Sequence, residues 1–149
     1  MDELESNKMK TYIYGGMFAI ANRLQVLGDN FDENISTKQW FLIAIIESFK
    51  GERPTISMAA ERMGTSRQNV KKMAEILKKK GFLEIKKDEH DARIQRLIST
   101  DYSREYFASR EQRENEYIEY LFKDFDEGML SVMCKCLAQF EKNIEGMSR

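Results

Sequence analysis

The chain begins with a helical pattern of apolar residues. Between residues 8 and 27 they recur every three or four positions, which places them on one wide face of a helix. A polar stretch at 28–34 interrupts the pattern. The next segment, 36–49, is almost continuously apolar, so we expect a helix that is buried on most sides and forms the centre of the core. Ser36 and Gln39 have the spacing of a capping box that opens this helix.

Two further helices are predicted after a loop at 50–54. The first begins at residue 55 or 56, and Gly64 ends it. The second begins at residue 65 or 66, where Thr65 and Gln68 have the spacing of another capping box. Gly81 is expected to end this helix as the residue just past its cap. An apolar stripe at helical spacing marks the expected buried face of the second helix: Val70, Met73, Ala74 and Leu77.

A β-hairpin and two more helices complete the predicted elements. The runs 82–86 and 94–98 are rich in β-prone residues and are separated by a charged turn at 87–93. Helical patterns resume at Thr100 and again over 129–144. The predicted fold is mainly α with a small β-hairpin wing, a winged helix-turn-helix flanked by N- and C-terminal dimerisation helices.

The predicted domain organisation is one domain with two kinds of segment. The DNA-binding lobe spans 35–100, and the dimerisation helices span 8–30 and 101–147. The apolar faces of the terminal helices exceed what one small core can absorb, so we expect a two-fold homodimer that buries them.

Charge is unevenly distributed along the 149 residues. The net charge is only −1, yet the segment 53–96 holds twelve Lys or Arg against six Asp or Glu. A basic module between acidic flanks fits a surface that docks on phosphates. The polar, acidic start and the lack of a long apolar run predict a cytoplasmic protein.

The order of helix, turn, basic helix and hairpin is what a winged helix-turn-helix needs to read DNA. In this motif the N-terminal residues of the second helix contact base edges in the major groove, and Arg, Gln and Asn side chains match those edges. Hydroxyls at the start of the first helix can bind a phosphate, and a cation at the wing tip can enter a minor groove. The predicted DNA-binding residues are Thr55, Ser57, Ser66, Arg67, Gln68, Asn69, Lys71, Lys72, His90 and Arg93.

Residues 55–100 resemble the DNA-binding lobe of the MarR family of bacterial transcription regulators. The resemblance rests on a helix that ends Leu77-x-x-x-Gly81 before a strand, and on Asp91-x-Arg93 in the wing. It implies that Asp91 orients Arg93, which reaches DNA. The family's Leu-Thr-x-x-Gly after the second strand is here Ser-Thr-Asp-Tyr-Ser, at 99–103.

The resemblance also implies a small lipophilic or phenolic effector bound between the lobes. Candidate pocket residues are Tyr12, Met17, Trp40, Phe41 and Tyr106, although core packing explains them equally well.

Other chemistries find little support in the sequence. It has no G-x-S-x-G, no P-loop, no G-x-G-x-x-G after a strand and no Cys–His pair suited to catalysis, so we expect no enzyme activity and no cofactor. His90 is the single histidine, which makes a poor zinc or copper site. Cys134 and Cys136 point to different sides of a helix, so they cannot readily bridge each other. Because their segment has the apolar pattern of a core or a dimer interface, we expect buried, reduced thiols, with disulfide chemistry between subunits as the alternative.

The function expected from these observations is sequence-specific binding of double-stranded DNA at a pseudo-palindromic operator. The protein would act as a homodimeric transcriptional repressor released by a small-molecule effector. The alternative is a winged-helix module that binds another protein and has no specific affinity for DNA.

Overall fold

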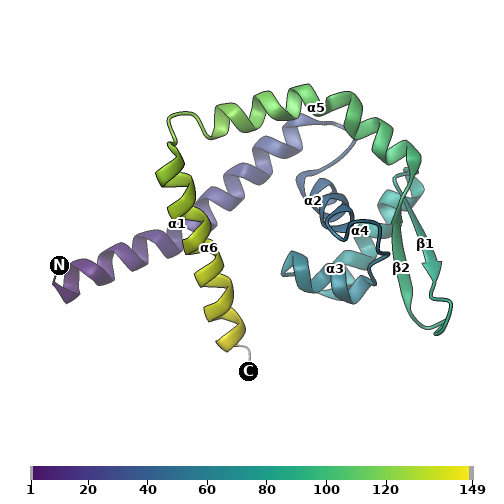
Figure 1. Ribbon diagram of the computed structural model, residues 1–149, viewed down its shortest axis with the longest axis horizontal. Helices are drawn as coiled ribbons and strands as arrows, with labels where there is room; N and C mark the ends of the chain where they lie inside the picture. Colours follow the sequence, from purple (N-terminus) through teal and green to yellow (C-terminus); the bar gives the residue numbers. More distant parts are fainter. Residues whose placement is uncertain (1, 148–149) are drawn as a thin grey trace. The chain divides into compact units, whose positions relative to one another are not determined.

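The computed structural model describes residues 2–147, which form two compact units, one up to Glu105 and one from Tyr106. The elements of the chain, in order, are α1 (Glu3–Phe31), α2 (Thr37–Glu47), α3 (Ile56–Met63), α4 (Arg67–Lys79), β1 (Leu83–Lys87), β2 (Gln95–Ser99), α5 (Asp101–Leu121) and α6 (Glu127–Met147). This mainly helical architecture with a two-stranded antiparallel hairpin (Figure 1) confirms the predicted fold class.

The core of the first unit lies where α2, α3 and α4 pack together beside the hairpin (Figure 1). The apolar stripe predicted on α4 lies on its buried face, since Val70, Ala74 and Leu77 have no exposed surface, while Met73 is half-buried. Leu42 of α2 and Leu97 of β2 are also fully buried. Burial of a side chain of this size contributes about 1.5–3 kcal/mol, so these contacts hold the helices in fixed positions around the hairpin.

The central helix α2 is less enclosed than its sequence suggests. Its middle and end are buried at Leu42, Ile43 and Ile46, but Trp40 and Phe41 in its first turns remain 38% and 39% exposed. The expectation of a helix buried on most sides is therefore wrong for its N-terminal part, because the neighbouring elements cover these two side chains only in part.

Two glycines with positive φ end the helices of the helix-turn-helix. Gly64 has φ of 68° at the end of α3, and Gly81 has φ of 84° after α4. The N–H of Phe82 donates to the carbonyl of Leu77 at 2.9 Å, and the N–H of Gly81 donates to that of Lys78 at 3.0 Å. These two bonds form a Schellman motif, which confirms Gly81 as the residue that ends the helix.

The helix starts agree with prediction in one case and differ in another. Ser36 and Gln39 form the predicted capping box of α2. The box predicted from Thr65 to Gln68 is wrong, since Ser66 is the N-cap of α4 and its hydroxyl accepts the N–H of Asn69 at 3.1 Å. The hydroxyl of Thr65 instead accepts the side-chain amide of Asn69 at 3.1 Å, so both hydroxyls stabilise the turn.

Both strands of the hairpin start one residue later than predicted. Leu83 pairs with Ser99 and Lys87 pairs with Gln95. The N–H of Phe82 is used to end α4, and the N–H of Ile94 closes the wing turn by donating to the carbonyl of Asp91 at 2.9 Å. Because local turn bonds take up these donors, the ladder begins after them.

After β2 the chain returns to a helix as predicted. The hydroxyl of Thr100 accepts the N–H of Ser103 at 3.1 Å and donates to the carbonyl of Gly81 at 2.7 Å. Thr100 therefore caps α5 and ties it to the end of α4. Ser103, where the resemblance has glycine, is fully buried.

In the second unit, α6 has no buried residue. Cys134 and Cys136 are free and exposed there, so neither is buried in a core of this unit, and their burial in a dimer interface stays a prediction. The predicted apolar face of α6 is present, but nothing in the same unit covers it. No helix within residues 2–147 is both long and apolar enough to cross a membrane.

Candidate nucleic-acid interface

A groove of about 590 Å³ brings together residues from three separate parts of the first unit. Its walls come from the start of α3, the first turns of α4 and the beginning of the strand β2. The lining residues are Thr55, Ile56, Ser57, Arg67, Gln68, Lys71, Arg93, Ile94 and Gln95. Six of these were predicted from the sequence as DNA contacts, whereas Ile56, Ile94 and Gln95 were missed because apolar and neutral side chains carry no local signal of binding.

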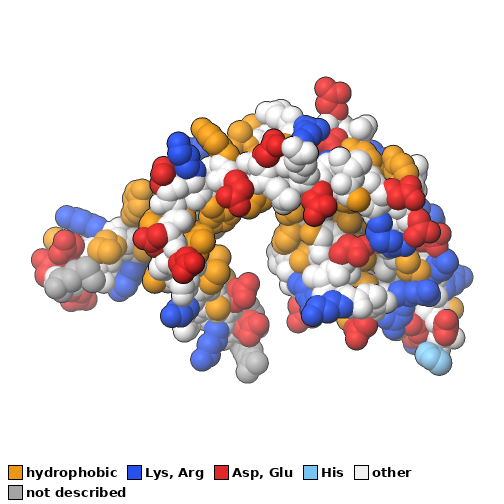
Figure 2. All heavy atoms as spheres, turned by 45° about the horizontal axis from the view of Figure 1, so that its top comes forward, with side chains coloured by type: hydrophobic (Ala, Val, Ile, Leu, Met, Phe, Trp, Pro, Cys, Tyr) orange, Lys and Arg blue, Asp and Glu red, His pale blue; other side chains and the backbone are white. Residues whose placement is uncertain are grey.

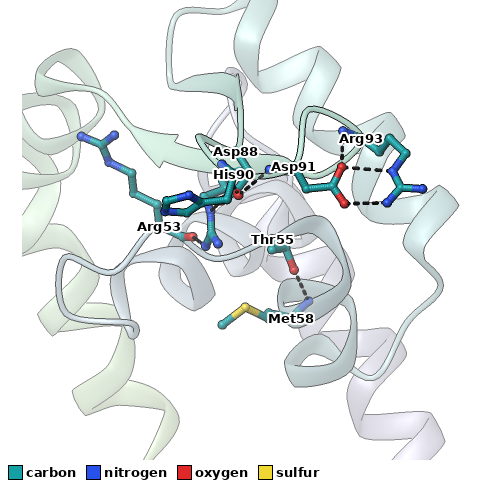
Figure 3. Close-up of polar contacts among 8 residues, drawn as sticks. Arg53, Thr55, Met58, Asp88, His90, Asp91 and Arg93 are labelled. Carbon is teal, nitrogen blue, oxygen red and sulfur yellow. Dashed lines mark hydrogen bonds and ion pairs between the residues drawn. The ribbon is translucent and has the colours of Figure 1, made fainter.

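The start of α3 presents backbone donors to the groove. Thr55 is the N-cap, and its hydroxyl accepts the N–H of Met58 at 3.1 Å (Figure 3). Ser57 in the first turn is exposed. Because the first N–H groups of a helix lack partners within the helix and carry partial positive charge, this end can bind a phosphate oxygen.

The start of α4 supplies most of the groove's hydrogen-bonding side chains. Arg67, Gln68 and Lys71 line the groove and are exposed. Lys72 is exposed on the same helix without being among the lining residues, and Ser66 is the N-cap. The basic and amide side chains on this helix tip have the chemistry needed to contact guanine, adenine and phosphates.

The wing presents Arg93 to the groove. Its guanidinium makes a bidentate contact with the carboxylate of Asp91 (Figure 3). Nε donates to Oδ1 at 3.1 Å, and Nη2 donates to Oδ2 at 3.0 Å. The side-chain hydrogen bond from Arg93, followed by its backbone N–H, lowers the pKa of Asp91. Asp91 therefore stays charged and orients a guanidinium that is 91% exposed.

A second ion pair lies in the same turn and was missed from the sequence. The carboxylate of Asp88 accepts from Nε of Arg96, and its Oδ2 accepts the N–H groups of His90 at 3.0 Å and Asp91 at 3.1 Å. The hydrogen bond from Arg96, then the one from the His90 backbone, lowers the pKa of Asp88 to about 2. The only sequence signal for this pair was Asp88 itself near the start of the turn, because Asp side chains commonly hydrogen-bond to backbone N–H groups of turns.

His90 is exposed on the wing, where its backbone N–H is used in the turn. It does not line the groove at the strand β2. Among residues 2–147, no group of three or more His, Cys, Asp or Glu side chains could hold a metal ion.

The lysine run 78–80 at the end of α4 has two exposed members and one that bonds to another part of the unit. Lys78 and Lys79 are exposed in the last turn. Lys80 donates from Nζ to the carbonyl of Asn34 at 2.6 Å and to Oε1 of Gln39 at 3.4 Å. Lys80 therefore ties the end of α4 to the start of α2. Figure 2 shows Lys and Arg side chains interspersed with acidic ones over the part of the surface that carries the hairpin.

The candidate effector residues lie on three helices. Tyr12 and Met17 belong to α1, Trp40 and Phe41 to α2, and Tyr106 to the part of α5 in the second unit. Within the first unit, the rings of Trp40 and Phe41 are stacked with centroids 6.5 Å apart.

Comparison with known proteins agrees with this architecture. The model of the MarR family matches residues 33–94. A MarR protein from Peptoclostridium difficile DA00132 is 24% identical, with 91% of this chain and 89% of that chain covered and a TM-score of 0.78. A MarR/EmrR family regulator from Acinetobacter sp. ADP1 is 15% identical, with 93% and 98% covered and a TM-score of 0.80.

FabT from Streptococcus pneumoniae, solved in complex with DNA, is 22% identical, with 93% of this chain and 99% of that chain covered and a TM-score of 0.67. At these identities the likeness to solved structures concerns the fold. The search of curated proteins found no match. The matched segment 33–94 contains most of the winged helix-turn-helix, and over this segment the chain resembles the MarR family.

Proposed function

We propose that the protein is a transcriptional regulator that binds double-stranded DNA through the groove formed by α3, α4 and the wing. The observation that carries the proposal is the convergence of Thr55, Arg67 and Arg93 on one surface. A helix N-terminus, a recognition-helix tip and a wing cation are the three parts that a winged helix-turn-helix uses on DNA. The matched FabT structure, which was solved with DNA, has the same fold.

In this proposal the chemistry of each side chain decides which part of the DNA it contacts. Arg67, Gln68 and Asn69 read base edges in the major groove. The other predicted contacts bind the backbone or reach the minor groove: Thr55, Ser57, Ser66, Lys71, Lys72, His90 and Arg93. Phosphate contacts position the protein, while base contacts give it sequence preference.

We further propose that two copies form a homodimer through the terminal helices, at 8–30 and 101–147, leaving 35–100 as the DNA-binding lobe. Within their own units, α1 and α6 bury no residue. Large apolar side chains on α6 are exposed, with Val132 at 58% and Leu137 at 55%. Because contiguous apolar faces of this kind are unfavourable in water, a second copy that covers them is the occupant that the family resemblance supports.

The proposed mechanism of regulation is geometric. A dimer on a pseudo-palindromic operator must hold its two recognition helices about 34 Å apart, one turn of DNA. A small lipophilic or phenolic effector that favours another spacing would release the DNA and relieve repression. A coupling free energy of about 1–3 kcal/mol between the two sites is enough for such a switch.

The DNA-binding proposal is tested by selecting sites from random genomic DNA with the full-length protein. The affinity for the best site and for a scrambled copy is then measured at two salt concentrations. We expect a site with two half-sites about one helical turn apart that binds about 10³-fold or more tightly than the scramble. Equal, weak binding to both would reject the proposal and favour a module that binds another protein.

The dimer and the effector have separate tests. Sedimentation of the wild type should give twice the chain mass, and Leu137→Glu should give single chains if α6 is the interface. Trp40 is the single tryptophan, so its emission should change on titration with 4-hydroxybenzoate, a phenolic probe. Unchanged emission and unchanged DNA binding at saturating probe would argue against a phenolic effector.

A further inference from the structure

The wing turn is organised around the carboxylate of Asp88. This side chain follows β1 and is only 9% exposed. Its Oδ2 accepts two backbone N–H groups of the turn, those of His90 and Asp91 (Figure 3). Its Oδ1 accepts from Nε of Arg96. The next residues in the turn include Arg93, so the conformation that presents Arg93 depends on Asp88 remaining in place.

Arg96 connects this turn to the loop that precedes α3. Its Nη1 donates to the carbonyl of Arg53 at 2.7 Å, while its Nε donates to Asp88. The backbone supports the same junction, because the N–H of Leu97 donates to the carbonyl of Pro54 at 2.9 Å and Thr55 forms a β-bridge with Arg96. The wing is thus fastened to the segment that ends at the N-cap of α3.

The two arginines of the wing are in different situations. The side chain of Arg93 is 91% exposed, and its guanidinium bonds to Asp91. The side chain of Arg96 is 35% exposed and already bridges two partners. A planar guanidinium can hold a carboxylate and a carbonyl at the same time in a fixed geometry, which a lysine ammonium does not reproduce. Arg96 therefore acts as a strut, which here means a side chain that bridges Asp88 of the wing to the carbonyl of Arg53. The exposed guanidinium of Arg93 instead has the chemistry of a DNA contact.

We propose that Arg96 is a positioning residue for DNA binding, which acts by joining Asp88 of the wing to the Arg53 carbonyl and does not itself touch DNA. The strut holds Arg93 at a set distance from Thr55 on the opposite element of the same groove. This proposal rests on the proposed function, since it assigns a role within DNA binding. The lowered pKa of Asp88 agrees with a carboxylate that stays charged in this junction.

The test compares Arg96→Lys with Arg104→Lys in the full-length protein. Arg104 is a matched control because it also joins a carboxylate, that of Asp101, to a backbone carbonyl, that of Ser99 at 3.0 Å. Both variants keep the positive charge and lose the guanidinium fork. The measurements are amide hydrogen exchange of His90 and Asp91 in the free protein, and affinity for the DNA site selected with the wild type.

We expect Arg96→Lys to speed exchange at His90 and Asp91 and to weaken specific DNA binding by about three- to tenfold, because charge-assisted bonds of the turn are lost. Arg104→Lys should leave the exchange of His90 and Asp91 unchanged, because Arg104 bonds to Asp101 and Ser99. If Arg96 acts through Arg93, the double variant R93A/R96K should bind within about twofold of R93A alone.

Three results would overturn the proposal. Unchanged exchange in Arg96→Lys would show that the wing does not need the strut, whatever the protein binds. Losses that multiply in the double variant would show that Arg96 contacts DNA independently. A wild-type protein that selects no DNA site would refute the proposed function and this role with it, and the exchange data distinguish that outcome from the first.

Discussion

Replacement of Arg93 by alanine removes one cation from the groove with little effect on the fold. The side chain is 91% exposed, and its bonds are confined to Asp91, two residues away. Exposed ion pairs of this kind contribute little to stability. A change in DNA binding by Arg93→Ala therefore reports the loss of a contact with DNA.

The expected magnitude follows from counterion release. Each cation that neutralises a phosphate contributes about −0.9 to the slope of log affinity against log salt. Arg93→Ala should thus flatten the slope by about 0.9 per protomer, or about 1.8 for a dimer with both wings engaged. Between about 50 and about 200 mM salt, affinity should fall about 3.5-fold less per protomer than in the wild type.

The assay is fluorescence anisotropy of a labelled DNA site at four salt concentrations. Lys38→Ala is the matched control, since Lys38 is an exposed cation on α2 that does not line the groove and lies outside the proposed dimerisation helices. Its slope should equal that of the wild type. If Arg93→Ala and Lys38→Ala both kept the wild-type slope and affinity, the wing would have no part in DNA binding and the groove would have to be redefined without it.

Three further outcomes concern stability. Leu77→Ala, at a fully buried position of α4, should lower the free energy of unfolding by about 2–5 kcal/mol in urea titration; a loss under about 1 kcal/mol would contradict its place in the core. Ser66→Ala should cost about 1 kcal/mol through the lost N-cap, and Ser66→Asp, which keeps an acceptor, should restore it. The pKa of Asp88 is lowered from 3.8 to about 2, so the contribution of this carboxylate to stability is present above about pH 4 and is lost as the pH falls towards 2. Carboxyl NMR can follow the titration of Asp88 in the folded protein. A titration midpoint near about pH 4 would contradict the lowered pKa.

Much of the DNA-binding lobe could be predicted because its signals are local. The stripe of Val70, Ala74 and Leu77 has the helical period, and a buried face follows from it directly. Gly81 ends α4 because a positive φ favours glycine. The Asp91–Arg93 pair was expected from the resemblance of the wing to the MarR family, and the structure forms it as a direct contact.

Other features depended on neighbours that the sequence does not place. The choice of Ser66 over Thr65 as N-cap was decided by the backbone of the turn, since both residues have the right chemistry. Trp40 and Phe41 have the hydrophobicity of core residues, but burial is a property of what packs around a side chain, and their surroundings leave them partly exposed.

The amino-acid sequence by itself determined the order of the elements and the buried face of α4, and it supplied the side chains that we propose as DNA contacts, because period, turn chemistry and side-chain type act over a few positions. Only the tertiary structure decided which of those residues share a groove. It also decided that Arg96 joins Asp88 to the carbonyl of Arg53, which lies 43 residues before Arg96 in the chain. The physical reason is that a hydrogen bond depends on distance in space, and packing of the core brings together groups whose separation along the chain carries no signal.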